Sequence, residues 1–221
     1  MSNIAGKAYA MNVLTPMKPS RTWFNRLIFM AARGLPSKLG GLLGLSLIHF
    51  ARWAIVKRDQ WPNPDDPAAN QSIDNDYMLF CSNFNGTWDQ YIDAFSDGIP
   101  DGLDLFWYSS TKYPNSIPIT PFKNYITHNQ VDTDYYYNAT PGSAQRDIKC
   151  ALKVYRTLLA LTEQHKAAKS EQEKEKFADT YAKALGEVQS CLGDPGFGPI
   201  ASLDTELADE NRKTLVEAIW S

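Results

Sequence analysis

A chain of 221 residues, of which 43% are apolar and 21% charged, has the composition of a globular protein and not of a disordered or collagen-like one. No apolar run reaches the roughly 18 residues that a membrane-spanning helix needs. The net charge of −3 is unevenly spread, because residues 1–60 hold nine Lys or Arg and one acid, whereas the remainder holds thirteen bases and twenty-four acids. The basic part is strongly apolar and the rest is acidic, so nucleic acid is not expected as a partner.

The basic N-terminal part contains a predicted strand at Tyr9–Thr15 and a predicted helix at residues 22–33. The apolar stripe of this helix combines Trp23 and Leu27 with neighbouring apolar residues, and bases occur throughout residues 18–38. This pattern is typical of a helix that lies on an anionic membrane surface, and also of a helix that packs on a sheet.

The stretch from Ser46 to Gln90 organises the rest of the chain. Residues 46–57 and 77–84 are both apolar on alternating faces, which indicates two adjacent strands in the interior of a sheet covered on both sides. Asn85-Gly86 then predicts a turn with positive φ. Thr87 and Gln90 have capping-box spacing, and the apolar residues that follow predict a helix over residues 88–95.

The C-terminal half is predicted to hold fewer strands. Residues 103–108 are interpreted as a minor strand, residues 124–128 as a helical turn and residues 133–139 as a further strand. A long helix with an apolar stripe begins near Ser143. A second helix, capped by Ser170, makes a hairpin with it, and a last helix covers residues 206–220.

This order predicts an α+β fold, a ferredoxin-like βαββαβ sandwich over residues 1–142, with a helical extension over residues 143–221 that packs on the core. Helices of such a sandwich cover one face of the sheet only. The second face would be covered either by a second copy of the chain, which gives a homodimeric α+β barrel, or by the C-terminal helices.

The three cysteines, Cys81, Cys150 and Cys191, are widely separated and odd in number. We expect them to be buried thiols in a reducing compartment. With no evident secretory signal at the start of the sequence, the expected location is cytoplasmic, or peripheral to a membrane.

Several motifs resemble those of an uncharacterised bacterial family. They are His-Phe-Ala-Arg at residues 49–52 and Ser-Asn-Phe-Asn-Gly at residues 82–86, together with Tyr-Tyr-Tyr-Asn-Ala-Thr-Pro-Gly at residues 135–142. The core of that family is similar to the dimeric α+β barrel superfamily, which includes dye-decolourising peroxidases and chlorite dismutases. The resemblance covers roughly residues 8–160 and implies a ferredoxin-like core. Asn85 stands where the family has an Asp, and Ser82 stands where the peroxidase motif begins with Gly.

The candidate site residues are polar side chains in apolar surroundings. We expect a ligand-binding role for six of them: His49, Arg52, Asn83, Asn85, His128 and Tyr137. His49 is also typical of a hydrogen-bonded core histidine, and Arg52 of a salt bridge to Asp76 or Asp89.

The lead hypothesis from the sequence is a protein that binds an apolar or amphipathic small molecule, such as a lipid, between the sheet and its covering layer. One alternative is a haem-dependent, peroxidase-like oxidoreductase with His49 or His128 as the axial ligand. Another is a membrane-peripheral or protein-interaction module that uses the basic N-terminal helix.

Overall fold

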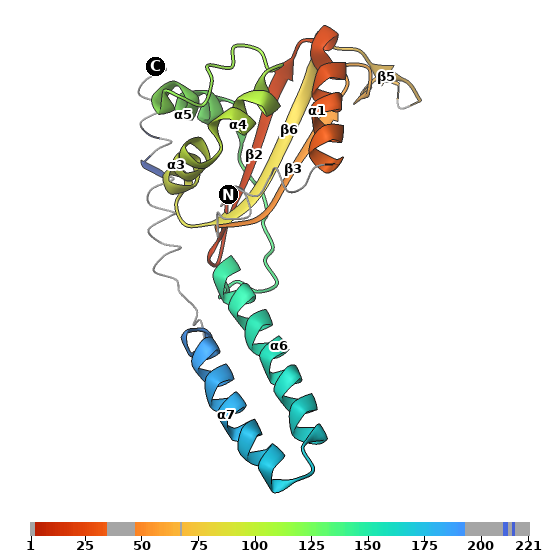
Figure 1. Ribbon diagram of the computed structural model, residues 1–221. Coiled ribbons are helices and arrows are strands. Elements are labelled where there is room, and N and C mark those ends of the chain that lie inside the picture. Colours follow the sequence, from red (N-terminus) through yellow and green to blue (C-terminus); the bar gives the residue numbers. More distant parts are fainter. Residues whose placement is uncertain (1–2, 35–46, 67, 193–209, 212–213, 215–221) are drawn as a thin grey trace.

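The computed structural model describes residues 3–34, 47–66, 68–192, 210–211 and 214. The predicted α+β class is confirmed, because an antiparallel sheet carries a layer of helices on one face (Figure 1). Most of the last predicted helix, at residues 206–220, lies outside the described residues.

The main sheet has the order β1-β2-β6-β3, and β7 also pairs with β2. Its strands are β1 (Ile4–Ala5), β2 (Ala8–Met17), β3 (Ile48–Val56), β6 (Asp76–Asn85) and β7 (Gln130–Val131). Every pairing in it is antiparallel. A small second sheet joins β4 (Trp61–Pro62) to β5 (Asn70–Gln71). The long strands were predicted close to their observed bounds, because their β-branched and aromatic residues favour extended backbone.

The helices that cover the sheet come from two segments. The first is α1 (Thr22–Gly34), preceded by the short 3-10 helix η1 (Pro19–Arg21). The second segment forms α3 (Trp88–Gly98), α4 (Pro100–Trp107) and α5 (Ile119–His128). The predicted capping box is confirmed, since the hydroxyl oxygen of Thr87 accepts from the backbone N–H of Gln90 and the side-chain oxygen of Gln90 accepts from the backbone N–H of Thr87. Gly86, at the turn before it, has a φ of +90°.

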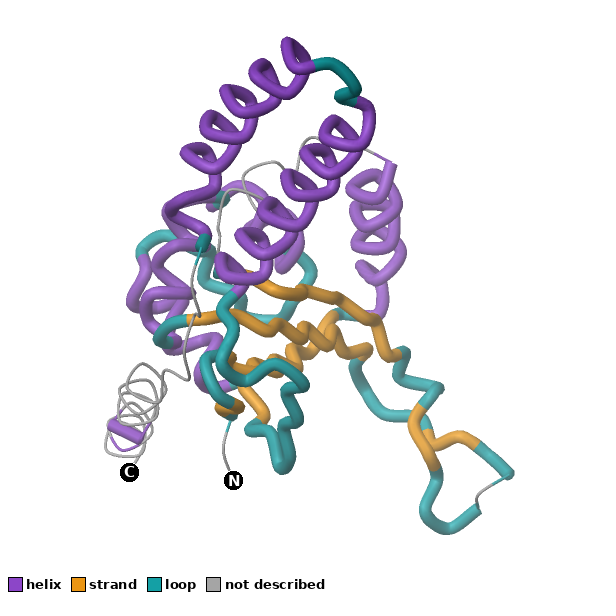
Figure 2. Tube along the Cα trace, turned by 90° about the horizontal axis from the view of Figure 1, so that it is seen from below, coloured by secondary structure: helices purple, strands orange, loops and turns teal. Residues whose placement is uncertain are grey.

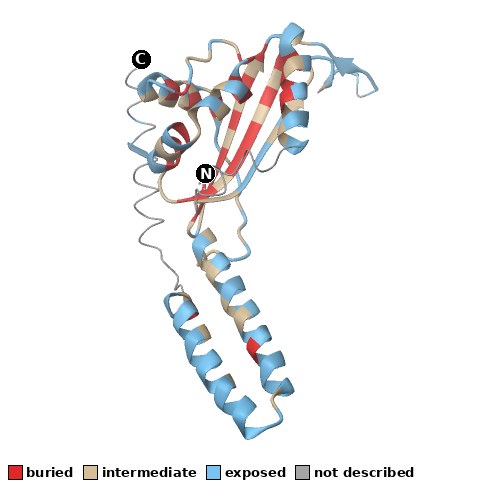
Figure 3. Ribbon diagram, viewed as in Figure 1, coloured by how far each residue is buried: buried red, intermediate tan, exposed pale blue. Residues whose placement is uncertain are grey.

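The core lies between these helices and one face of the sheet. Opposite pairs such as Tyr9–Phe84 and Val13–Phe80 point toward the helices and are buried (Figure 3). Phe84 stacks on Tyr91 of α3 with ring centroids 3.8 Å apart. The alternate residues of the same strands face the other side, where burial is less complete. The core is therefore one apolar layer between sheet and helices.

The interpretation of β3 as an interior strand was wrong. Among the described strands β3 lies at the edge of the sheet, paired with β6 only. Phe50 is 73% exposed and Arg52 is also exposed. The register shifts at His49, between Ile48 and Phe50, so that Ile48 shares the helix-covered face with Trp53. A bulge of this kind breaks simple alternation, which explains why both faces looked apolar in the sequence.

Two further strand predictions were wrong. Residues 103–108 lie mostly in α4, where Leu103, Phe106 and Trp107 are buried with the i, i+3, i+4 spacing of a helix. Residues 133–139 form no strand, because β1 and β7 already occupy the outer edge of β2. Asn83 Nδ2 instead donates to the hydroxyl of Tyr136 at 2.9 Å, which ties this segment to the second face of the sheet.

The C-terminal hairpin consists of α6 (Gln145–Ala167), α7 (Glu171–Val188) and the short 3-10 helix η3 (Gln189–Cys191). It projects from the end of the sheet (Figures 1 and 2), and most of its side chains are exposed. Its apolar stripe, Ile148 and Leu152 included, is largely at the surface. The expectation of three free thiols was wrong, since Cys150 and Cys191 form a disulfide across the hairpin and only Cys81 is free.

Candidate functional site

The polar residues singled out in the sequence do not form one site. His49, Arg52, Asn83 and Asn85 lie on strands β3 and β6, toward the second face of the sheet. His128 ends α5 in the helical layer, and Tyr137 is 73% exposed, so neither belongs to that group.

Asn85 has a structural role at the end of β6. Its Nδ2 donates to the carbonyl of Lys7 at 2.8 Å, and its Oδ1 accepts from the backbone of Gln145 at 2.8 Å. These bonds hold the β1–β2 turn and the start of α6 together. The same turn requires Gly6, whose φ is +64° and where a Cβ atom would lie 2.1 Å from the carbonyl oxygen of Pro141.

His49 lies at the bulge of β3 and is half-buried. Desolvation lowers the pKa of its imidazole, and a hydrogen bond with the Asn85 side chain opposes that shift. Its Nε2 is buried and has no hydrogen-bond partner among the described residues. Burial also raises the pKa of the nearby Tyr136, against the effect of its bond with Asn83.

The salt bridges suggested for Arg52 are not formed. Asp89 pairs with Lys123 at 2.9 Å. Asp76 is buried and accepts hydrogen bonds from the hydroxyl of Thr22 and from the backbone of Arg58. Since Arg52 is exposed, it carries little desolvation cost and needs no buried partner.

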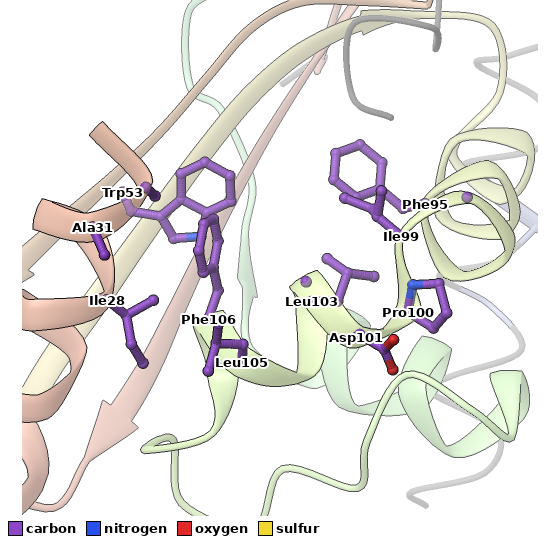
Figure 4. Close-up of a pocket in the computed structure, with 13 residues that line it drawn as sticks. Ile28, Ala31, Trp53, Phe95, Ile99, Pro100, Asp101, Leu103, Leu105 and Phe106 are labelled. Carbon is purple, nitrogen blue, oxygen red and sulfur yellow. The ribbon is translucent and has the colours of Figure 1, made fainter. Parts of the chain in front are cut away.

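A cavity of about 480 Å³ lies elsewhere, between the sheet and its helical layer. Figure 4 shows Trp53 of β3 and Ile28 of α1 on one side of it and Phe95 and Ile99 on the other. Its volume falls within the ~300–1,000 Å³ range typical of small-molecule sites. The lining residues are Ile28, Ala31, Ala32, Trp53, Phe95, Gly98, Ile99, Pro100, Asp101, Gly102, Leu103, Leu105 and Phe106.

The junction of α3 and α4 shapes this cavity. Ile99 caps the C-terminus of α3 and directly precedes α4, which starts at Pro100. Proline suits the first turn of a helix because no backbone N–H is needed there. The chain therefore turns within one residue, and α4 presents Leu103 and Phe106 toward the sheet while Asp101 stays exposed at the rim.

One polar atom in the cavity lining is unsatisfied. The indole Nε1 of Trp53 is buried and has no hydrogen-bond partner among the described residues. Its ring is held by Phe106, with centroids 5.0 Å apart, and by Phe80 at 4.8 Å. A buried N–H without an acceptor costs about 1–3 kcal/mol, and since almost none of the surface of this atom is accessible, a ligand oxygen would reach it only after the rings packed around it shift.

The sequence interpretation missed this cavity. Trp53 was interpreted only as an apolar strand residue. Residues 103–108 were predicted to form a strand, so the junction of α3 and α4 was not predicted. The detectable signal was the helical spacing of Leu103, Phe106 and Trp107 after a proline.

The described residues contain no group of three His, Cys, Asp or Glu side chains that could hold a metal ion. None of their helices is both long enough and apolar enough to cross a bilayer. No protein-family model, curated protein or solved structure matches the chain. The case for function therefore rests on the geometry of the molecule.

Proposed function

We propose that this protein binds an apolar or amphipathic small molecule, such as a lipid, in the cavity between α1, β3, α3 and α4. The observation that carries the proposal is a cavity of about 480 Å³ whose described lining is almost wholly apolar and includes Trp53, the residue with the unpartnered Nε1. A ligand that buries hydrocarbon there gains about 25 cal/mol for each Å² of apolar surface removed from water.

The charge at the rim of the cavity restricts which polar groups the ligand can carry. Among the described lining residues only Asp101, at the rim, is charged, and it repels an anionic head group. A neutral acceptor, such as a ketone, ester or ether oxygen, suits the indole N–H of Trp53. The ligand class is therefore an apolar molecule with one or a few neutral oxygens.

Haem fits this cavity poorly, because the lining residues that the structure describes include no His, Cys, Met or Tyr to act as an axial ligand. His49 and His128, the residues considered for that role, are not among the lining residues. Adding haemin to the purified protein tests the oxidoreductase alternative. A Soret shift that His49→Ala or His128→Ala removes would support it.

The ferredoxin-like assignment is also a proposal. The four main strands follow one another in space as β7, β2, β6 and β3, which supports it because the split βαβ arrangement places the third strand of the fold between the first two. The dimeric barrel is a further proposal, in which a second copy covers the face that exposes Phe50. Native mass spectrometry of the full chain measures the subunit number, and a monomer at high concentration would refute it.

Gly102→Leu tests ligand binding in the cavity. Gly102 lines the cavity in α4, and a Cβ atom there meets only Ile99 Cβ, at 3.8 Å. Glycine is less favourable than alanine in a helix interior by about 0.8–1.0 kcal/mol, and leucine ranks close to alanine, so the helix tolerates the change while the side chain fills the cavity. Gly186→Leu is the matched control, because Gly186 lies in α7 with nothing near its Cβ position.

The measurement is displacement of a neutral fluorescent apolar probe, N-phenyl-1-naphthylamine, by acetophenone, a small aromatic ketone. Wild type and Gly186→Leu are expected to bind the ketone equally, and Gly102→Leu is expected to bind it at least about tenfold more weakly. Equal binding by all three proteins would show that the cavity is not the site. Native mass spectrometry of protein from its own host then identifies any retained ligand.

A further inference from the structure

We propose that the outer face of α1 docks this protein onto an anionic lipid surface. Trp23, Leu27 and Met30 are 63%, 51% and 68% exposed. They recur at i, i+4 and i+7, so they form one stripe along the helix. Exposed aromatic and aliphatic residues in one helical stripe are typical of helices that lie in a membrane interface.

The inner face of α1 fixes which side points outward. Asn25 is fully buried, and its Nδ2 donates to the carbonyl of Phe106 at 2.7 Å. Ile28 is buried in the core, and the ring of Phe29 lies 6.4 Å from that of Trp53. With these contacts made, the helix cannot turn its exposed stripe toward the sheet, and the stripe stays available to an external partner.

The charge around the stripe specifies that partner. Lys18, Arg21, Arg26 and Arg33 lie in or just before α1, and residues 18–34 contain no Asp or Glu. Arg26 and Arg33 are exposed and seven residues apart, so they form a row along one flank of the stripe. Juxtamembrane bases contribute about 1 kcal/mol each near an anionic leaflet, whereas an acidic residue here would oppose binding.

A cleft beside this flank extends the basic surface. It has a volume of about 290 Å³ and is lined by Trp23 and Arg26 of α1 and by Lys57 and Arg58 after β3, together with Asp59 and Asp76. Its formal charge is three bases minus two acids, or +1. The Asp76 carboxylate is occupied by two internal donors, so within the described lining Asp59 alone opposes the three bases that would meet a phosphate or carboxylate of a lipid head group.

The stripe and the cavity adjoin each other on α1. Ala31 is exposed, follows Met30 directly and lines the cavity. A docked protein would therefore hold the cavity close to the bilayer, from which an apolar ligand could enter. The docking proposal does not depend on ligand binding in the cavity, and the experiment separates the two.

The experiment is flotation of the purified full chain with vesicles of phosphatidylcholine alone, or with about 30% phosphatidylserine added. The wild type is expected to float with the anionic vesicles only, and less at high salt because screening weakens the attraction. Removal of two cations in the double variant Arg26→Ala/Arg33→Ala is expected to weaken binding about 25-fold, from about fivefold for each. Lys176→Ala/Lys183→Ala is the matched control, since both lysines are exposed on α7, where acids outnumber bases.

The apolar contribution is tested in the same way. Leu27→Ser is expected to reduce binding about tenfold, and Leu185→Ser, at a partly exposed position of α7, to leave it unchanged. Gly102→Leu is expected to float like the wild type, because it should weaken ligand binding in the cavity without changing the outer face of α1. This variant therefore distinguishes failure of ligand binding from failure of membrane docking. Circular dichroism confirms that each variant is folded.

Three results would overturn the proposal. The wild type fails to float with anionic vesicles, or the α1 variants float as well as it does. The third result is that Leu152→Ser, on the exposed stripe of α6, abolishes flotation while the α1 variants still float, which would place the membrane contact on the hairpin.

Discussion

Replacement of Trp53 by Phe tests the polar contact on which the proposed ligand class depends. The change removes the buried Nε1, which has no acceptor among the described residues, and keeps an aromatic ring against Phe106. A neutral hydrogen bond contributes about 0.5–1.5 kcal/mol, and 1.4 kcal/mol is a factor of ten. The variant is therefore expected to bind a carbonyl ligand about 2- to 12-fold more weakly than the wild type does.

The assay compares acetophenone with ethylbenzene, which has nearly the same shape and no acceptor. Affinities are measured by displacement of the same fluorescent probe. We expect Trp53→Phe to lose affinity for acetophenone and to keep its affinity for ethylbenzene. Trp61→Phe is the matched control, because Trp61 also has a buried Nε1 to which no described residue offers an acceptor, but it lies in β4, outside the cavity.

Equal loss for both ligands would refute the hydrogen bond, since it would show that only the shape of the indole matters. An unchanged affinity for acetophenone would also refute it. If Trp61→Phe weakened the ketone as much as Trp53→Phe, the effect would be global and would not locate the site.

Three further predictions concern stability. Folding lowers the pKa of His49 from its ordinary 6.5, so the contribution of His49 to the free energy of unfolding is fully present above pH 6.5 and is lost as the pH falls through the folded-state pKa. Urea unfolding at about pH 7.5 and about pH 5 should show this loss of stability, and the loss should be smaller in His49→Gln. Cys150→Ser/Cys191→Ser removes a cross-link between residues 41 positions apart. By chain entropy this cross-link stabilises the fold by about 4 kcal/mol, so amide hydrogen exchange in α6 and α7 should accelerate, and unchanged exchange would contradict this prediction. Asp76→Ala removes the acceptor of two internal hydrogen bonds at a buried position. The free energy of unfolding should therefore fall by roughly 3 kcal/mol. A loss below about 1 kcal/mol would show that water replaces the carboxylate.

The α+β class and the long elements were predictable because they depend on local patterns. The capping box at Thr87 and Gln90 and the positive φ at Gly86 are set by backbone geometry within a few residues. The helical spacing of α1 is equally local. Such signals do not require knowledge of what lies across the fold.

The candidate site was predicted less well, because burial depends on distant neighbours. His49, Asn83 and Asn85 were chosen as polar residues among apolar ones, and the structure places them on the same side of the sheet, but Asn85 is occupied by bonds to Lys7 and Gln145. The cavity was missed since its lining combines α1, β3 and the α3–α4 junction. No short sequence window contains that juxtaposition.

What the sequence determined by itself is the three long strands, the long helices and the concentration of basic residues before Asp59. What only the tertiary structure decided is their environment: β3 became an edge strand through a bulge at His49, and α6 turned its apolar stripe largely to the surface. The physical reason is that propensity and periodicity act along the chain. Exposure of a face, and the unpaired N–H of Trp53, depend on which other segment packs against it.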